Sequence, residues 1–340
     1  MFHSRSLACK KPYGAAPAGE PVEFTVYPRR EHSVSRLTLW VEEDGQQAAA
    51  YPMRWFGLVG ARDRYCASFT PPHSGLYWYW FTFDTADGPR FCARGYGGRS
   101  EVLDSMGDRY QLTVYDPSYQ PPRWFGEGIT YNIFPDRFCR DREPVQPEGE
   151  GIAPRVLHEN WDDLPVYRPD EHGEILNNDF FGGTLRGVME KLDYLESLHV
   201  QTIYFNPIFQ AYSNHRYDTG DYKRIDPLLG SEEDFKTLCE QAKKRGMRVV
   251  LDGVFNHTGY DSRYFNGHGR YDSLGAHQSK DSPYYPWFDF SEWPDKYGSW
   301  WGIYTLPQVN ERNPDYQSFI FRDADSVVRR WLRLGASGWR

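Results

Sequence analysis

The sequence predicts two domains, an antiparallel β-sandwich followed by a parallel α/β domain. Across roughly the first third of the 340 residues, apolar and polar side chains alternate with period two, which is the pattern of half-buried strands. Beyond a proline-rich break at 120–122, short apolar runs typical of buried strands alternate with stretches of helical spacing. The aromatic fraction of 17% excludes a long disordered chain, because such chains contain few aromatic residues.

Composition also limits the kinds of binding partner and the cellular compartment that are expected. The formal charge is −8 and no dense run of Lys or Arg is present, so nucleic acid is not an expected partner. The five cysteines include no CxxC pair, which argues against a zinc site and against a disulfide framework. The N-terminus lacks the apolar core of a signal peptide, and no apolar run of about 18 residues occurs. These features predict a cytoplasmic protein with no membrane partner.

The front domain is predicted from its strand patterns. Residues 1–20 are small, polar and rich in Gly and Pro, so we expect a loose N-terminal segment there. The β-sandwich is expected over 21–118, and Asp87-Gly88 predicts a hairpin turn within it. Its predicted strands include 22–26, 37–41, 75–83 and 110–115.

The second domain is expected over 123–340, because the preceding prolines stiffen the chain and remove backbone donors. Apolar residues three or four apart, such as Leu185, Val188 and Leu192, indicate its first helix. Ser231 is a favourable N-cap for the second helix, and acidic residues follow it. The predicted strands are 129–134, 202–205 and 247–251, and the predicted helices are 184–198, 231–246 and 314–334. Strands that alternate with helices are typical of a parallel α/β fold.

A long aromatic and Gly-rich stretch, 253–312, separates the third strand of this domain from its last helix. It is too long for an ordinary connection between two elements. We therefore expect a small inserted subdomain after the third strand.

Polar residues follow two of the predicted strands. Asp252 comes directly after the third strand, with Asn256 and His257 close behind it, and the loop after the second strand carries His215 and Tyr217. In parallel α/β barrels the functional residues gather at these strand ends. Aromatic residues crowd the same loops: Tyr212, Tyr222, Tyr260, Tyr264, Trp300 and Trp301. Rings beside carboxylates and amides suit a sugar. A single His or Asp is more often a structural hydrogen-bond partner, so only the joint pattern favours a site.

Five segments carry a resemblance to a known family: YNIFPDRF (131–138), the stretch 180–222, LDGVFNHTG (251–259), SWWGIYTLPQVNE (299–311) and GASGWR (335–340). In this order they resemble the α-amylase family, glycoside hydrolase family 13. The nearest branch contains the neopullulanases, cyclomaltodextrinases and maltogenic amylases. The resemblance implies a (β/α)₈ TIM barrel behind a carbohydrate-binding-like sandwich.

The resemblance also implies a reaction. Members hydrolyse α-1,4 and in some cases α-1,6 links of α-glucans such as starch, maltooligosaccharide, pullulan or cyclodextrin, with retention. An Asp nucleophile and a Glu acid/base about 5 Å apart fit such a double displacement. Hydrolysis and transglycosylation are not distinguished by this sequence.

Three residues match catalytic positions of the family. His257 corresponds to the histidine that donates to a hydroxyl of the sugar at the cleavage point, and Asp252 to a supporting carboxylate. Arg340 corresponds to the arginine two positions before the nucleophile, whose positive charge keeps that carboxylate ionised. Asp252 and Arg340 are expected to pair, although both could be merely structural.

Four residues are expected to bind substrate. Tyr217 matches the tyrosine that stacks under the sugar at the cleavage point, and His215 lies beside it in the sequence. Asn256 belongs to the same signature as His257, and Trp301 is one of the loop aromatics. Asn132 replaces the usual Gln of the first strand, so one sugar contact is expected to be lost.

The sequence departs from the family at its end. The nucleophile belongs two positions beyond Arg340, and the signatures with the acid Glu and the second Asp are absent. We therefore expect an N-terminal fragment with about three and a half βα units of the barrel, inactive on its own. The alternative is a non-catalytic carbohydrate-binding protein or a relic. A transporter-associated member is disfavoured by the lack of a membrane span.

Metal and partner expectations follow from the same resemblance. Members of this branch often bind Ca²⁺ through an Asn-Gly-Asp run and a later Asp, which are here Cys139-Arg140-Asp141 and Thr184. Because Ca²⁺ needs several oxygen ligands, we expect no metal and no cofactor, although Asn256 is a calcium ligand in other branches. The branch also implies a homodimer formed through the N-terminal domain.

Overall fold

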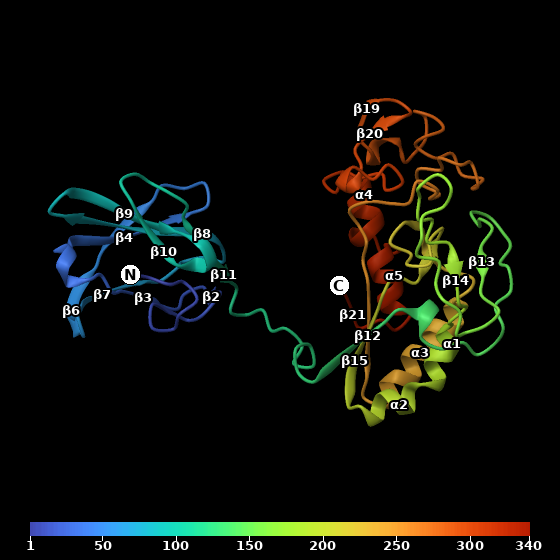
Figure 1. The fold of residues 1–340 in the computed structure, drawn as a ribbon, viewed down its shortest axis with the longest axis horizontal. Coiled ribbons are helices and arrows are strands. Elements are labelled where there is room, and N and C mark those ends of the chain that lie inside the picture. The colour runs from blue at the N-terminus through green and yellow to red at the C-terminus, as the bar shows by residue number, and fades with distance from the viewer. The chain divides into compact units, whose positions relative to one another are not determined.

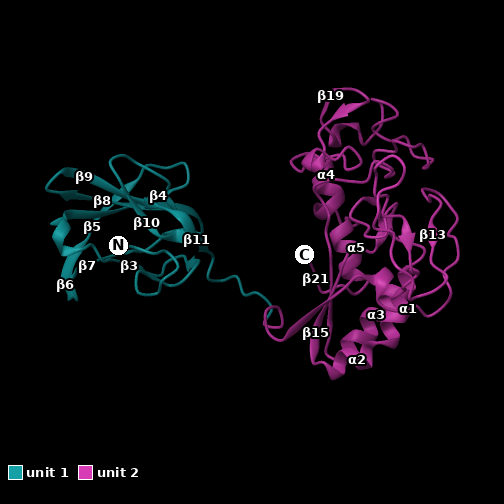
Figure 2. Ribbon diagram, viewed as in Figure 1, with its two compact units in different colours: residues 1–122 teal, residues 123–340 magenta.

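The chain forms two compact units that divide after Pro122 in the computed structural model, which describes residues 1–340. Figure 1 shows the elements and Figure 2 the two units, 1–122 and 123–340. Each unit has its own hydrophobic core, one built around Phe24, Tyr79 and Phe81 and the other around Ile203, Phe205 and Leu238.

Unit 1 is β-rich, as the sequence predicts. One sheet has the order β1 (Lys10–Lys11), β3 (Val22–Val26), β7 (Arg62–Phe69) and β6 (Arg54–Val59). The other has the order β10 (Ser100–Leu103), β9 (Gly88–Arg94), β8 (Gly75–Thr85), β11 (Tyr110–Tyr115) and β2 (Ala16–Pro17), with β4 (Ser35–Glu43) bridging β8 and β5 (Ala49–Pro52). Two 3₁₀ turns, η1 (Arg30–His32) and η2 (Tyr96–Gly98), complete the unit. All strands pair antiparallel except β11 with β2.

Residues 1–20 are not loose, and this expectation is wrong. Strand β1 pairs with β3 and β2 pairs with β11, so both belong to the sheets. Phe2 and Ala16 are buried, and the ring of Phe2 meets that of Tyr110 edge-on at 5.1 Å. The polar composition does not reveal this arrangement, because strand pairing uses backbone groups. The buried side chains of Phe2 and Ala16 also hold the segment against the unit.

Unit 2 is organised around a parallel sheet of four strands in sequence order. These are β12 (Ile129–Ile133), β15 (Val200–Phe205), β18 (Arg248–Leu251) and β21 (Gly338–Trp339). Tyr204 lies opposite Val250, and Val250 opposite Gly338. Because the strands are parallel, their carboxyl ends share one edge, and the loops that follow them meet there.

The helices of unit 2 bury the predicted apolar faces but are more broken than predicted. They are α1 (Leu185–Glu190), α2 (Leu192–Ser197), α3 (Glu232–Lys244), α4 (Pro314–Gln317), the π-turn η6 (Ser318–Arg322) and α5 (Val327–Arg333). Ser231 and Asp234 form a capping box at the start of α3. The helix expected over 314–334 is interrupted because Asp323 is extended and Ser326 occupies the N-cap position of α5, a role that suits a hydroxyl side chain better than a helix interior.

The remaining elements are short. They are η3 (Pro135–Arg137), β13 (Val156–Leu157), β14 (Asp179–Phe180), β16 (Phe209–Ala211), β17 (Thr219–Ile225), η4 (Tyr285–Trp287), β19 (Phe290–Glu292), β20 (Lys296–Tyr297) and η5 (Trp300–Gly302). Residues 253–312 between β18 and α4 contain only the β19–β20 hairpin and two 3₁₀ turns, packed through aromatic rings such as Phe265 against Phe288. No helix combines the length and the apolar character that crossing a bilayer requires.

Candidate active site

Asp252 is the centre of a polar cluster at the carboxyl edge of the parallel sheet. It follows β18 and is only 2% exposed. Its Oδ2 accepts hydrogen bonds from the hydroxyls of Tyr204 (2.6 Å) and Tyr217 (2.8 Å), and its Oδ1 accepts one from Nη1 of Arg340 (3.2 Å). We call Asp252, Tyr204, Tyr217 and Arg340 the Asp252 cluster. Three donors satisfy the buried carboxylate, as burial of a charge requires.

The protonation states in the Asp252 cluster are fixed by these contacts. Burial, and next the hydrogen bond to Asp252, raise the pKa of both the Tyr204 and the Tyr217 hydroxyl, so both remain donors. The hydrogen bond and charge of Asp252 raise the pKa of the Arg340 guanidinium. The Arg340 side chain is 68% exposed in residues 1–340.

His257 adjoins the Asp252 cluster through the backbone of Tyr217. Its Nε2 lies 3.0 Å from the carbonyl oxygen of Tyr217. A carbonyl can only accept, so Nε2 carries the proton. Burial lowers the pKa of His257, which favours the neutral ring, and Nδ1 is then an acceptor that is buried without a partner. The N–H that the resemblance expects to donate to a sugar hydroxyl is therefore already bonded to the Tyr217 carbonyl. Nδ1 is the ring nitrogen that remains free to accept a hydrogen bond from a hydroxyl.

Aromatic rings connect His257 to the surface. The ring of Trp300 lies 5.3 Å from that of His257, and Trp301 stacks on Trp300 at 4.8 Å with an interplanar angle of 7°. Trp301 is 85% exposed, and its φ of 52° places it in the left-handed region. The stack thus presents a flat apolar face to solvent at the end of a chain of rings.

His215 lies close to the Asp252 cluster, whereas the backbone of Asn256 bonds to Val309 instead. Nδ1 of His215 contacts Oγ of Ser213 at 3.0 Å and accepts from the backbone N–H of Tyr217 at 3.1 Å. The carbonyl of Asn256 accepts from the N–H of Val309 at 3.1 Å. The structure therefore brings Asp252, Tyr217, Arg340, His257 and His215 together, with Trp301 reached through the ring stack.

Sequence reasoning missed Tyr204, Trp300 and a pair of amides. Tyr204 looks like a strand residue, and only its place at the end of β15 hints that its hydroxyl reaches Asp252. Trp300 was counted among the loop aromatics without a role. Nδ2 of Asn132 donates to Oδ1 of Asn206 at 2.9 Å and to the carbonyl of Tyr204 at 3.1 Å. The side-chain amide of Asn132, which is one methylene shorter than that of Gln, thus bonds to other groups of the protein at the strand ends.

A second ionic cluster underlies the loop that carries His215 and Tyr217. Both carboxylate oxygens of Asp226 accept from Arg155 at 2.7 Å, and Arg216 lies 3.3 Å away. We call these three residues the Asp226 clamp. Burial raises the pKa of Asp226, but the charges of Arg216 and Arg155 outweigh it and lower the pKa to about 2. Arg216 has a φ of 60° and is fully buried, so the Asp226 clamp holds a left-handed residue between His215 and Tyr217.

The residues at the family's calcium position do not fit that ion. Oγ1 of Thr184 donates to Oδ1 of Asp141 at 2.6 Å, and Nη1 of Arg142 lies 3.5 Å from Oδ2 of Asp141. Arg140 pairs with Glu143 at 3.2 Å. One carboxylate, already paired with a cation and a hydroxyl, offers too few oxygen ligands for Ca²⁺.

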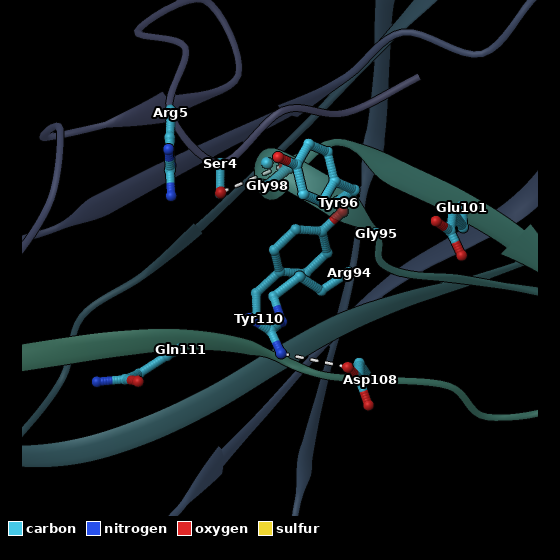
Figure 3. Close-up of a pocket in the computed structure, with 11 residues that line it drawn as sticks. Ser4, Arg5, Arg94, Gly95, Tyr96, Gly98, Glu101, Asp108, Tyr110 and Gln111 are labelled. Atoms are coloured by element: carbon cyan, nitrogen blue, oxygen red, sulfur yellow. Dashed lines mark hydrogen bonds and ion pairs between the residues drawn. The ribbon is translucent and has the colours of Figure 1, made fainter. Parts of the chain in front are cut away.

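Each unit also has a sizeable cavity. In unit 2 a cavity of about 580 Å³ is lined by His215 and Asp218 on one side and by Tyr260 and Asp261 on another. In unit 1 a cavity of about 570 Å³ lies beside Tyr96, as Figure 3 shows. Arg94 donates to Asp108 across that cavity at 3.2 Å, and the Tyr96 ring is 98% exposed.

A parallel sheet whose strands follow in sequence order, with charged and aromatic side chains at their carboxyl ends, is an arrangement found in TIM-barrel-type enzymes. A sequence profile described as "Alpha amylase, catalytic domain" matches residues 132–340, which is more than half of the chain. The chain therefore belongs to the α-amylase family of glycoside hydrolases.

Individual relatives place it in one branch of that family. It is 34% identical to an amylopullulanase of Thermoanaerobacterium saccharolyticum over 97% of this chain and 28% of the relative. It is 32% identical to an intracellular maltogenic amylase of Bacillus subtilis (strain 168) over 87% of this chain and 47% of the relative. A solved cyclomaltodextrinase matches with a TM-score of 0.57 and 26% identity over 97% of this chain and 54% of that one. The chain thus spans about a quarter to a half of its relatives, and the predicted branch is confirmed.

Proposed function

We propose that unit 2 supplies one half of the active site of an α-glucan glycoside hydrolase. The observation that carries this proposal is the Asp252 cluster, in which a buried carboxylate orients Tyr217 and Arg340 at the carboxyl edge of the parallel sheet. Relatives named for maltogenic activity and for pullulan support an α-glucan with α-1,4 or α-1,6 links as the substrate.

Each residue of the site has a physical role in this proposal. The Tyr217 ring, fixed by its hydroxyl on Asp252 and its backbone on His257, stacks under a glucosyl ring. Nδ1 of His257 accepts a sugar hydroxyl. Arg340 stabilises a nearby carboxylate in its ionised form. Asp252 itself is a positioning residue, because its three hydrogen bonds leave it poorly suited to attack a sugar.

The reaction requires a pair of catalytic carboxyl groups, and the Asp252 cluster does not contain such a pair. A retaining mechanism uses two carboxyl groups about 5 Å apart, and Asp252 is the only carboxylate hydrogen-bonded within the Asp252 cluster. The four-stranded sheet corresponds to the first half of a (β/α)₈ barrel, with 253–312 inserted after β18. Residues 1–340 alone therefore bind glucan without hydrolysing it.

The test combines a binding and an activity measurement on residues 1–340. Isothermal titration with maltohexaose is expected to show binding that Tyr217→Ala weakens at least about tenfold. Tyr194→Ala, which removes a half-exposed ring from α2, is the matched control and should bind normally. No reducing sugar should appear from maltohexaose or pullulan. Hydrolysis by residues 1–340, or unchanged binding in Tyr217→Ala, would contradict the proposal.

A second candidate function is non-catalytic carbohydrate binding through unit 1. The exposed Tyr96 ring beside a cavity lined by Arg5, Arg94 and Glu101 favours it (Figure 3), because an aromatic face next to polar groups suits a sugar. Tyr96→Ala separates the two functions. It abolishes maltohexaose binding if unit 1 alone binds glucan and leaves it unchanged if the Asp252 cluster does.

Unit 1 also carries the proposed homodimer contact. Strand β6 is at the edge of its sheet and exposes Trp55, Phe56, Leu58 and Val59. An exposed apolar edge strand is prone to pair with another chain. Sedimentation equilibrium is expected to show a dimer that Phe56→Lys dissociates, and a monomeric wild-type chain would contradict this contact. The cytoplasm remains the compartment we propose.

A further inference from the structure

The cavity of unit 2 is separate from the Asp252 cluster but shares a wall with it. The cavity measures about 580 Å³, within the range of small-molecule sites. It is lined by residues from the segments 174–177, 212–218, 259–270 and 303–306. Its chemistry comes from Tyr212, His215, Asp218, Tyr260, Asp261 and Tyr304.

One carboxylate oxygen of Asp261 has no hydrogen-bond partner in this cavity. Its side chain is 9% exposed, and Oδ2 pairs with Nη1 of Arg270. The other oxygen, Oδ1, is buried with no partner. Burial raises the pKa of Asp261, while Arg270 opposes that shift. A buried acceptor without a donor is costly, so a ligand hydroxyl that donates to Oδ1 would be stabilising.

Aromatic rings and an excess of carboxylates in the lining restrict the kind of ligand. The rings of Tyr260 and Tyr304 lie 6.3 Å apart, and Tyr304 is 60% exposed, so its face is available for stacking. Asp218 and Asp261 disfavour an anion. No group of three or more His, Cys, Asp or Glu side chains is placed to hold a metal ion, and Arg270 pairs with Asp261. A neutral molecule rich in hydroxyls and with an apolar face fits these groups.

Short contacts link the cavity to the Asp252 cluster. Oγ of Ser213 donates to Asp218 and contacts Nδ1 of His215 at 3.0 Å. The ring of His215 lies 5.9 Å from that of Tyr217, whose hydroxyl is bonded to Asp252. The segment 213–217 therefore presents one histidine to the cavity and, two residues later, a tyrosine to the Asp252 cluster.

We propose that this cavity binds glucosyl units of the same α-glucan chain that occupies the Asp252 cluster, with Oδ1 of Asp261 accepting a sugar hydroxyl and Tyr304 stacking on a sugar face. This inference rests on the proposed function and extends it to a residue set outside the Asp252 cluster. It makes Asp261 and Tyr304 determinants of affinity for long glucans.

The experiment is isothermal titration of residues 1–340 with maltohexaose and with maltose. Tyr304→Ala is expected to weaken maltohexaose binding about fivefold or more, and Ile303→Trp, which fills the cavity from a half-exposed position, should do the same. Maltose binding should change less, because a disaccharide occupies only the Asp252 cluster. Tyr167→Ala is the matched control, since Tyr167 is 61% exposed and does not line the cavity.

Asp261→Asn tests the hydroxyl contact itself. It should weaken maltohexaose binding while a thermal melt within a few degrees of wild type shows that the fold persists. If that variant melts early, the two surface variants, Tyr304→Ala and Ile303→Trp, decide the matter alone.

The outcomes separate this inference from the proposed function. Unchanged maltohexaose binding in both Tyr304→Ala and Ile303→Trp, with a loss in Tyr217→Ala, overturns the cavity site and leaves the proposed function standing. A loss in the cavity variants with no loss in Tyr217→Ala overturns the continuity between the two sites. Absence of binding by the wild-type chain overturns both.

Discussion

Asp226 and Asp252 are two of the buried aspartates of unit 2 that contact arginines, and they differ in what surrounds the ion pair. Asp226 is fully buried, and its partners Arg155 and Arg216 are 5% and 0% exposed. Asp252 is 2% exposed, but its partner Arg340 has a side chain that is 68% exposed. Both carboxylates are satisfied, Asp226 by arginines buried in the fold and Asp252 by groups at the carboxyl ends of the strands and in the loop above them.

The comparison separates a structural ion cluster from a functional one. Every donor around Asp226 faces inward and fastens chain segments, from Arg155 to Asp226 across 71 positions of sequence. The donors around Asp252 come from strand ends and a loop, and they fix a tyrosine and an arginine at the carboxyl edge of the parallel sheet. Burial and charge alone therefore do not identify a site. The two clusters differ in where their donors lie, since those of Asp252 come from the strand ends and the loop that carries Tyr217.

The largest expected effect is on the Asp226 clamp. Asp226→Ala leaves two buried guanidinium groups without their counter-charge and should lower the free energy of unfolding of unit 2 by about 3–5 kcal/mol. Urea denaturation followed by tryptophan fluorescence measures this. A loss below about 1 kcal/mol would mean that water replaces the carboxylate and that the Asp226 clamp is not structural.

Substitution of Asp252 should reduce ligand binding more than stability, unlike substitution of Asp226. Asp252→Ala leaves the Tyr204 and Tyr217 hydroxyls unpartnered, so the free energy of unfolding should fall by only about 1–3 kcal/mol. Maltohexaose binding should fall at least about tenfold, because Tyr217 and Arg340 lose their common anchor. The same two measurements on Asp226→Ala give the contrast. If Asp252→Ala and Asp226→Ala lost maltohexaose binding equally at the same stability, the Asp252 cluster would not differ in function from the Asp226 clamp.

The pH dependence provides a third comparison. Burial lowers the pKa of His257 and of His215, against the opposing charge of Asp218. As the pH falls below the unfolded histidine value of about 6.5, the unfolded chain takes up protons that the folded chain resists. Stability is thus fully present above that pH and decreases as the pH approaches the lowered folded values. The urea concentration at the midpoint of unfolding should decrease as the pH is lowered from about 7.5 to about 5.

A histidine exchange verifies the source of that dependence. The double variant His215→Gln and His257→Gln should flatten the profile. His172→Gln removes a ring that is 76% exposed and should leave it unchanged. If the double variant keeps the full slope, other groups are responsible.

Arg340 should matter little for stability. Its exposed ion pair with Asp252 predicts that Arg340→Lys changes the free energy of unfolding by less than about 1 kcal/mol. Binding should weaken more than stability, because an ammonium does not reproduce the planar guanidinium contact. A denaturation curve and a titration on one sample check both, and a stability loss above about 2 kcal/mol would assign Arg340 to the buried class.

The smallest expected effect is that of metal removal. Asp141 is occupied by Thr184 and Arg142, so neither excess chelator nor millimolar Ca²⁺ should shift the melting temperature by more than about 1 °C. A clear rise with Ca²⁺ would show that oxygen ligands assemble despite the arginines.

The site was predictable from the sequence where strand ends determine it. Asp252 and Arg340 follow neighbouring parallel strands, so their contact follows from strand order alone. Tyr217 and His257 lie in the loops above the same edge. These relations need only the parallel α/β pattern and the positions of a few residues.

Other features depend on contacts that no local pattern encodes. Arg155 lies in a segment without periodicity and finds Asp226 only in the folded chain. The π-turn and the extended Asp323 interrupt a helix whose spacing looked continuous. Residues 1–20 were misread because their composition describes surface loops, while backbone pairing and Phe2 decide their place. The cavity beside Asp261 likewise arises from four separate segments.

The central claim is that the Asp252 cluster holds a glucosyl ring. A crystal structure of residues 1–340 grown with maltohexaose tests it most directly. The account predicts a sugar ring stacked on Tyr217, within hydrogen-bond distance of His257 Nδ1 or Arg340. Sugar found only beside Tyr96 in unit 1, with the Asp252 cluster empty at saturating ligand, would contradict it.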